Sequence, residues 1–260
     1  MRTFAALALC ALAAASPLRV AASCSFKEFP SKSVQIEEGV SSSPLTRNRG
    51  VWHEDSLLVV ARDGNKRSGY VRAASDQRFG LTDNVYEGGA YLGVSPHLIL
   101  NAIGSFSPQH QTLPSSTTGG GADVRTGGGY GYQIQYTART YTSLSANTTT
   151  LGADRYFADR RVALIISMAT LSNVPGTAIS EGLTYARYLP CDNESFNVSS
   201  GRDVENAGAG TLALYRTITY DANDVHWFTT RFGLDMGAGW SVLIGAYNRF
   251  EVRVALRERI

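Results

Sequence analysis

"RFEVRVALRERI" (Arg249 to Ile260) ends the chain, and over most of its length apolar residues alternate with charged or small ones. Phe250, Val252, Val254 and Leu256 occupy every second position. Successive side chains of a β-strand leave opposite sides of the backbone, so the stretch predicts a strand with one apolar and one ionised face. Two environments fit such a strand. One is a protein core with water on the other side, and the other is lipid around a closed barrel with a polar interior.

The composition favours many strands and turns over a helical bundle. Among the 260 residues are 26 glycines and 13 tyrosines, and 43% of the chain is apolar. Charged residues make up 18%, below the usual share of about 25%. The net charge of +2 excludes a strongly basic tail, so we expect no nucleic-acid partner. Nearly all cations are arginines, whose planar fork suits carboxylate pairing in confined space.

The first residues predict a secretory signal. Arg2 precedes an apolar run, Phe4 to Ala15, that is followed by small residues. We therefore expect a signal peptide within residues 1–23, cleaved after Ser23 or alternatively after Ala15. No later stretch is an unbroken apolar helix of spanning length, so the exported chain is either soluble or a β-barrel.

The chain has three cysteines, of which Cys10 would leave with the signal. We expect Cys24 and Cys191 to be unpaired. A disulfide between them is chemically allowed after export, and so is lipidation of Cys24.

The remaining chain divides into two parts. Residues 24–50 are rich in serine, proline and charge, which predicts a flexible periplasmic N-terminal segment. Residues 51–260 alternate strand-like runs with turn signals and one longer loop, Ser107 to Gly121, and we expect them to form the barrel. The turn signals include "RDGNK" (62–66), "YDAND" (220–224) and "MGAGW" (236–240). Their spacing predicts about 12 strands, or alternatively about 10.

The polar faces of these strands decide between the two environments. In "WFTTRFGLDM", for example, Phe232, Leu234 and Met236 share one face, and Gly233 and Asp235 share the other. Such faces carry Arg, Asp, Glu, Gln and Gly, with almost no lysine, as a confined wet interior would. The sequence therefore predicts an all-β protein, an antiparallel up-and-down transmembrane β-barrel in the bacterial outer membrane. The alternative is a soluble secreted β-sandwich that binds carbohydrate.

Three stretches resemble the YaiO-like outer-membrane β-barrel family. They are "RFGLTDNVYEGGAYLGVSPHLILNAIGSFSP" (78–108), "TLGADRYFADRRVALIISMATLS" (150–172) and "WFTTRFGLDMGAGWSVLIGAY" (227–247). The resemblance covers roughly Trp52 to the C-terminus. It implies a monomeric barrel in outer-membrane lipid, inserted by the barrel-assembly machinery, with a structural or small-pore role and no enzymatic residues. It also allows a link to surface-polysaccharide export. The chain departs from outer-membrane barrels in general by ending on Ile260 instead of an aromatic residue.

Eleven charged residues are the candidate lining of the barrel interior. They are Arg72, Asp76, Arg78, Glu87, Arg139, Asp154, Arg231, Asp235, Arg249, Glu251 and Arg253. One hypothesis is a constriction that selects small anionic or sugar solutes, so that the partner is a polysaccharide or a small polar solute. The other is a balanced network that fills a narrow barrel, which we favour because both signs occur in similar number.

Catalytic and metal-binding motifs are weak. The four histidines, His53, His97, His110 and His226, are scattered, and the sequence has no CxxC or HExxH pattern. We therefore expect no metal, no cofactor and no catalytic residue. An outer-membrane enzyme that modifies lipid remains an alternative, because it would need only a nucleophile with a base in reach. The glycine-rich stretch "GGGADVRTGGGYGYQ" lacks a phosphate-binding pattern and predicts relief of crowding between strands.

Overall fold

The computed structural model describes residues 32–64, 66–172, 174–206 and 212–260. Within them, fourteen strands and one short 3-10 helix, η2 (Gly127–Gly129), account for nearly all regular structure. The strands are β1 (Lys32–Pro44), β2 (Val51–Asp63), β3 (Arg67–Arg78), β4 (Leu81–Ser95), β5 (Leu98–Phe106), β6 (Ser116–Arg125), β7 (Tyr130–Thr140), β8 (Ser145–Phe157), β9 (Arg160–Leu171), β10 (Val174–Tyr188), β11 (Asp192–Asn206), β12 (Leu212–Trp227), β13 (Phe232–Leu243) and β14 (Tyr247–Arg259).

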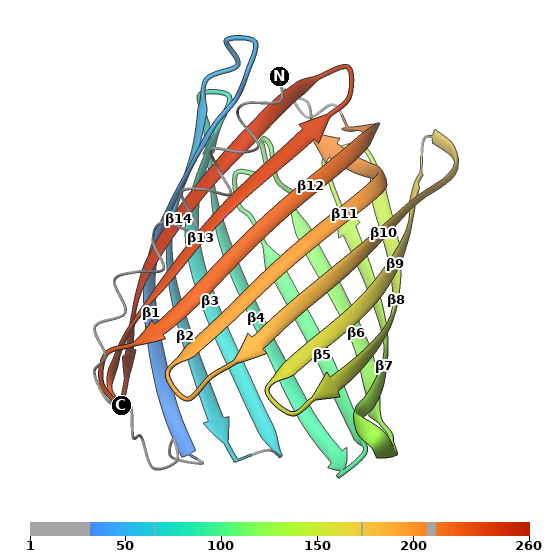
Figure 1. The fold of residues 1–260 in the computed structure, drawn as a ribbon. Helices are drawn as coiled ribbons and strands as arrows, with labels where there is room; N and C mark the ends of the chain where they lie inside the picture. Colours follow the sequence, from blue (N-terminus) through green and yellow to red (C-terminus); the bar gives the residue numbers. More distant parts are fainter. Residues whose placement is uncertain (1–31, 65, 173, 207–211) are drawn as a thin grey trace, which may run out of the picture.

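The strands form one closed antiparallel barrel in which each strand pairs with its neighbours in sequence (Figure 1). The prediction of an all-β up-and-down barrel is confirmed. The prediction of about 12 or 10 strands is wrong, because the described residues contain fourteen. Closure joins the first strand to the last. At this seam the backbone N–H of Val34 donates to Ile260 O at 3.2 Å, and Ile260 N–H donates back to Val34 O at 2.8 Å.

One of the unexpected strands is β1. It lies inside residues 24–50, for which the sequence predicted a flexible segment, so that prediction is wrong for Lys32–Pro44. The strand pairs along its whole length with β2, and from Gln35 to Ser42 with β14. The barrel therefore begins at Lys32 instead of residue 51. Residues 1–31, with the expected signal peptide and Cys24, lie outside the described residues.

Two expected turns lie inside strands instead. "YDAND" is part of β12 and "MGAGW" is part of β13, and the two segments pair with each other from Tyr220 to Asp224. The expected long loop is shorter than predicted, because β6 already begins at Ser116. The turn expected at "LTDN" (81–84) also lies inside a strand, β4, and the turn that joins β3 to β4 comes directly before it, where Phe79 and Gly80 both have positive φ, 53° and 78°. Two such residues in succession suit a tight hairpin.

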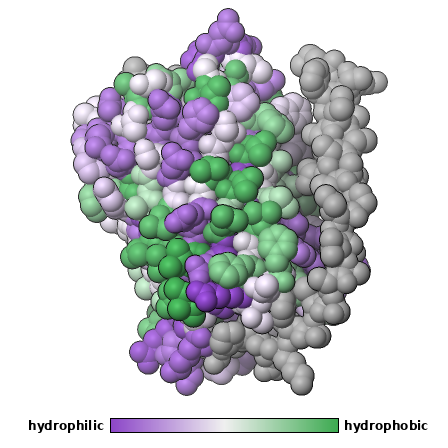
Figure 2. Space-filling model, turned by 90° about the vertical axis from the view of Figure 1, so that its left-hand side faces the viewer, coloured by the Kyte–Doolittle hydropathy of each residue, from purple (hydrophilic) through white to green (hydrophobic). Residues whose placement is uncertain are grey.

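The outer surface is apolar over much of its height. On the face drawn in Figure 2, hydrophobic surface gathers between hydrophilic upper and lower ends and is interrupted by hydrophilic patches. Where β7 begins and β8 ends, the Arg155 guanidinium lies 4.8 Å from the ring centre of Tyr130 and 4.6 Å from that of Phe157. Cationic and aromatic groups together suit the boundary between lipid and water. No helix among the described residues is both long and apolar enough to cross a membrane.

Cys191 is disulfide-bonded and only 3% exposed. The expectation that it is unpaired is therefore wrong. It packs with Val225 and Trp227 near the lower end of the barrel.

Candidate functional site

Strand register shows which side chains point into the barrel. In β14, Phe250, Val252, Val254 and Leu256 are outward and 41–64% exposed. The residues between them turn inward, and so do the residues that pair directly with them on neighbouring strands. The alternation in the last twelve residues thus separates an apolar outer surface from a charged interior.

Ten of the eleven predicted residues lie on the inward side by this register. They are Arg72, Asp76, Arg78, Glu87, Arg139, Asp154, Asp235, Arg249, Glu251 and Arg253. Arg231 does not, because β13 begins only at Phe232 and Arg231 belongs to the preceding turn. Its side chain is 60% exposed, and its Nε donates to Glu258 at 2.9 Å. The alternation of β13 therefore does not extend to Arg231, one residue before the strand begins.

An ion-pair triad closes the seam between the first and last strands from the inside. Arg257 of β14 lies between Glu37 of β1 and Asp235 of β13, with its Nε 2.7 Å from the Glu37 carboxylate and its Nη2 bonded to Asp235. All three side chains are at most 20% exposed. Removal of the cation would therefore leave two carboxylates close together in a poorly solvated place.

Arg253 of β14 reaches across β13 to its partners. Its guanidinium donates to Asp221 at 3.3 Å and to Asn223 at 3.0 Å, both on β12, and lies 3.6 Å from Glu251. It passes over Gly237 of β13, where an added Cβ would collide with the arginine side chain. The glycine that looked like part of a turn therefore makes room for an ion pair inside the barrel.

On β2 to β4 the interior carries a second charged group. Arg72 donates to Glu54, and the Tyr70 hydroxyl donates to Glu87 at 2.6 Å. Together with the triad and Arg253, these residues form one continuous ionised wall over β12 to β14 and β1 to β4.

This wall borders a cavity of about 240 Å³ inside the barrel. The charged side chains around it are five carboxylates and four guanidinium groups. They are Glu37, Glu54, Asp76, Asp235 and Glu251, and Arg72, Arg78, Arg249 and Arg253. The two signs nearly balance, so the cavity offers both cation-binding and anion-binding groups.

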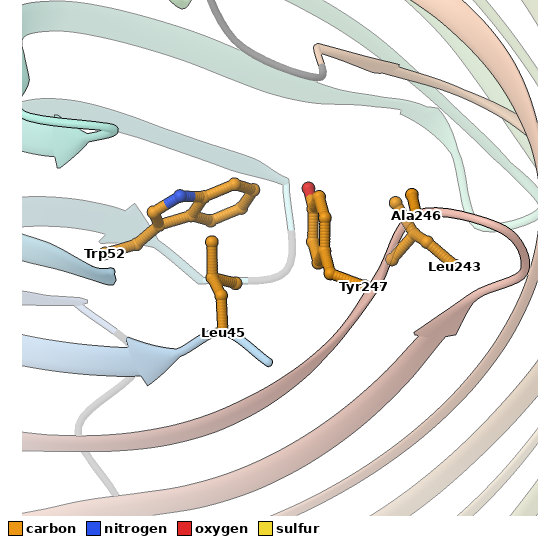
Figure 3. Packing of buried hydrophobic residues seen from close by; sticks show 5 residues of the cluster. All are labelled: Leu45, Trp52, Leu243, Ala246 and Tyr247. Atoms are coloured by element: carbon orange, nitrogen blue, oxygen red, sulfur yellow. The ribbon is translucent and has the colours of Figure 1, made fainter. Parts of the chain in front are cut away.

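Aromatic and apolar residues narrow the upper end of the interior. Figure 3 shows Trp52 and Tyr247 facing each other, with Leu45 beside them and Leu243 and Ala246 behind Tyr247. The two rings meet edge to face with their centres 6.0 Å apart.

Two arginines flank this cluster. The Trp52 ring lies 4.6 Å from the Arg78 guanidinium and 5.2 Å from that of Arg249, and Arg78 also binds Asp76 through two bonds of 2.7 and 2.8 Å. Both guanidinium groups are within the distance at which a cation is attracted to an aromatic ring.

The opposite wall is mostly neutral. Hydroxyl and amide side chains pair across it, with Thr150 and Ser167 3.1 Å apart and Thr184 donating to Asn197 at 2.6 Å. Its charged side chains include Arg139 and a group around Asp154, which binds Arg125 at 2.8 Å and Arg161 at 2.9 Å. The barrel interior is thus divided into an ionised wall and a wall rich in hydroxyl groups.

Asp83 holds the loop between β5 and β6 against the barrel. Its carboxylate is fully buried and accepts hydrogen bonds from the backbone N–H groups of Gln111, Thr112 and Leu113 and from the Thr112 hydroxyl, at 2.7 to 3.0 Å. The upper part of β4 has no β5 partner, since β5 ends at Phe106. The loop fills that gap.

Several interior residues were missed by sequence reasoning. They include Glu37, Glu54, Asp83, Arg125, Arg161, Asp221 and Arg257. Arg257 continues the alternation of the final strand and could have been included from that pattern. Glu37 shares a face with Gln35, but its strand was not recognised. Among the described residues, no group of three or more His, Cys, Asp or Glu side chains is arranged to hold a metal ion.

Comparison with known proteins shows the fold and no family. No protein-family model matches the chain, and no curated protein matches it. Among solved structures, it is similar to one titled "Bacterial polysaccharide outer membrane secretin", with a TM-score of 0.57 and 6% identity over 87% of this chain and 98% of the other. It is also similar to the "CymD monoaromatic hydrocarbon channel", with a TM-score of 0.59 and 10% identity over 90% of this chain and 89% of the other.

A third similar structure is OccK5 (OpdH) of Pseudomonas aeruginosa, with a TM-score of 0.50 and 8% identity over 88% of this chain and 97% of the other. At these identities the likeness concerns architecture alone. The chain therefore has the fold of outer-membrane β-barrel channels.

Proposed function

We propose that this protein is an outer-membrane β-barrel channel for small polar solutes. The observation that carries the proposal is the division of most strands into an outward face that is mainly apolar and an inward face that is mainly polar, around a cavity. That division is what a lipid-embedded barrel with an aqueous interior requires. The fold shared with outer-membrane channels supports the same placement.

The two interior walls support a solute that is polar but not strongly charged. Five carboxylates and four guanidinium groups around the cavity oppose a strong preference for either sign. The hydroxyl and amide side chains of the other wall can hydrogen bond to a polyol. We propose that the solutes are short sugars. More specifically, we propose that the channel has a role linked to polysaccharide export.

The YaiO-like assignment, the monomeric state and insertion by the barrel-assembly machinery remain proposals that rest on the sequence motifs. So does the absence of catalysis. Its support is that the contacts of the His97 and His110 rings are with backbone carbonyl groups and the contact of the His226 ring is with Asp192, and none of these partners is a hydroxyl group.

Planar-bilayer recording and liposome swelling test the channel. We expect small discrete conductance steps with weak selectivity between potassium and chloride, and faster swelling with a pentose than with a disaccharide. Absence of both would favour the second candidate, a structural barrel with a filled interior. The cluster of Leu45, Trp52 and Tyr247 at the upper end favours that candidate, because it narrows the entrance.

Variants of the cluster separate the two candidates further. Trp52→Ala with Tyr247→Ala should increase the conductance of a channel that is narrowed there. An unchanged zero conductance in this variant would leave only the structural role.

A further inference from the structure

The outer surface of β1 carries a carboxylate where the alternation calls for an apolar residue. Glu38 is exposed and outward, between Ile36 and Val40 of its own strand. It pairs directly with Leu256 of β14 and with Leu57 of β2, both of them outward and exposed. Glu38 thus lies within the apolar part of the surface.

A second carboxylate lies beside it. Asp55 of β2 is also outward and exposed, and it pairs with Val40 of β1. Glu38 and Asp55 are therefore diagonal neighbours on adjacent strands, about 7–8 Å apart. In the described part of the chain, neither carboxylate forms an ion pair or a hydrogen bond.

The two carboxylates border a groove of about 680 Å³ on the outer surface. Val40, Leu57, Tyr86 and Leu256 supply its apolar walls. Its floor includes the small outward residues Ala73 and Ser75 of β3, which leave room between the larger side chains. The groove is open enough for a protein segment to lie in it.

A carboxylate on the lipid-facing side of a barrel is unfavourable, and an ionisable group within a membrane commonly has a partner there. Anionic lipid headgroups do not suit this groove, because their charge repels the carboxylates. A second copy that docked symmetrically through the same face would set Glu38 and Asp55 against like charges. A cation on an otherwise apolar surface complements both the walls and the acids.

We propose that this groove docks a membrane-embedded segment of another protein that presents a lysine or arginine from an apolar face. The inference rests on the proposed placement in the outer membrane and adds a partner to it. The apolar walls contribute contact area, and the carboxylates select the partner by its charge.

The test uses the purified barrel in neutral phosphatidylcholine vesicles. The probe is a synthetic transmembrane Leu–Ala peptide with one central lysine, and the same peptide with a central glutamine is its reference. Fluorescence energy transfer between labelled peptide and labelled barrel measures binding. We expect the lysine peptide to bind at least about tenfold more tightly than the glutamine peptide.

Glu38→Gln with Asp55→Asn should abolish that preference. The matched control is Glu181→Gln, which neutralises another outward carboxylate, on β10, away from the groove. It should leave the preference unchanged. Glu38→Leu should raise the urea midpoint of the isolated barrel while it removes the preference, a combination that a purely structural role does not produce.

Each outcome decides something. A wild-type barrel without preference, or equal loss in the Glu181→Gln control, overturns the docking proposal alone. Preference in an inserted barrel that does not conduct supports docking and contradicts the channel. A barrel that stays in the aqueous phase overturns both.

Discussion

Arg257→Met removes the cation that separates two carboxylates at the closing seam. Methionine keeps much of the length of the arginine side chain and removes its charge. In the wild type, Arg257 Nε lies 2.7 Å from Glu37 and the same guanidinium also binds Asp235. In the variant, the carboxylates of Glu37 on β1 and Asp235 on β13 would face each other with no cation between them.

The expected cost follows from burial. The side chains of Arg257, Glu37 and Asp235 are 20%, 18% and 10% exposed, so the triad is closer to a buried salt bridge than to a surface one. Removal of one partner from such a pair costs about 3–5 kcal/mol, whereas replacement of the whole group by neutral residues is often nearly neutral. We therefore expect the single variant to lose more stability than the triple variant Arg257→Met, Glu37→Gln, Asp235→Asn.

Urea unfolding in phosphatidylcholine vesicles, followed by tryptophan fluorescence, measures these free energies. The control is Arg231→Met, which breaks an arginine–glutamate pair whose arginine is 60% exposed and should cost less than about 1 kcal/mol. If the triple variant loses as much as the single one, or the control loses as much as Arg257→Met, the triad does not stabilise the seam in this way.

Three further predictions concern other parts of the barrel. Val254→Arg, in the middle of an outward face, should lower the free energy of unfolding in vesicles by about 2–4 kcal/mol, whereas Phe232→Arg at the lower end of its strand should cost less than about 1 kcal/mol; equal losses would contradict a membrane-embedded surface. Asp83→Ala should remove four hydrogen bonds to a carboxylate, and hydrogen exchange should then accelerate in the loop between β5 and β6, with unchanged exchange as the opposing result. Gly121→Ala should cost about 1–3 kcal/mol, because its Cβ would collide with a backbone oxygen of β7, and Gly104→Ala, whose nearest contact would be 3.8 Å, should be much milder in the same unfolding assay.

The fold class was predictable because alternation is a local property. Phe250, Val252, Val254 and Leu256 of the last strand point outward, as their spacing predicted. The number of strands was harder to predict than the fold class. In β1 the outward set contains Glu38 and the inward set contains serines, so neither face reads as apolar and the strand resembles a polar segment.

The turns predicted at "YDAND" and "MGAGW" were wrong for a related reason. Asp221 and Asn223 are turn-forming residues in isolation, but inside the barrel they accept hydrogen bonds from Arg253. Gly237 likewise makes room for that arginine instead of bending the chain. A polar barrel interior uses the same residue types as turns, so composition alone cannot separate them.

Interior placement could be predicted for most candidates, and pairing could not. Asp235 was assigned to the interior from its own strand. Its partner Arg257 depends on the register between β13 and β14, and the third member, Glu37, comes from the opposite end of the chain. Arg231 shows the converse error. It lies one residue before β13 begins, where alternation no longer determines whether a side chain points inward or outward.

The seam between Val34 and Ile260 also constrains how the molecule can be made. The first strand leaves the ribosome long before its partner exists, and until the last residues arrive the sheet has two bare edges. Bare edges recruit other strands, and pairing between distant parts of a chain is slow. We therefore expect that the two open edges must be protected from other strands until β14 has been synthesised, and that the barrel closes only when β14 pairs with β1.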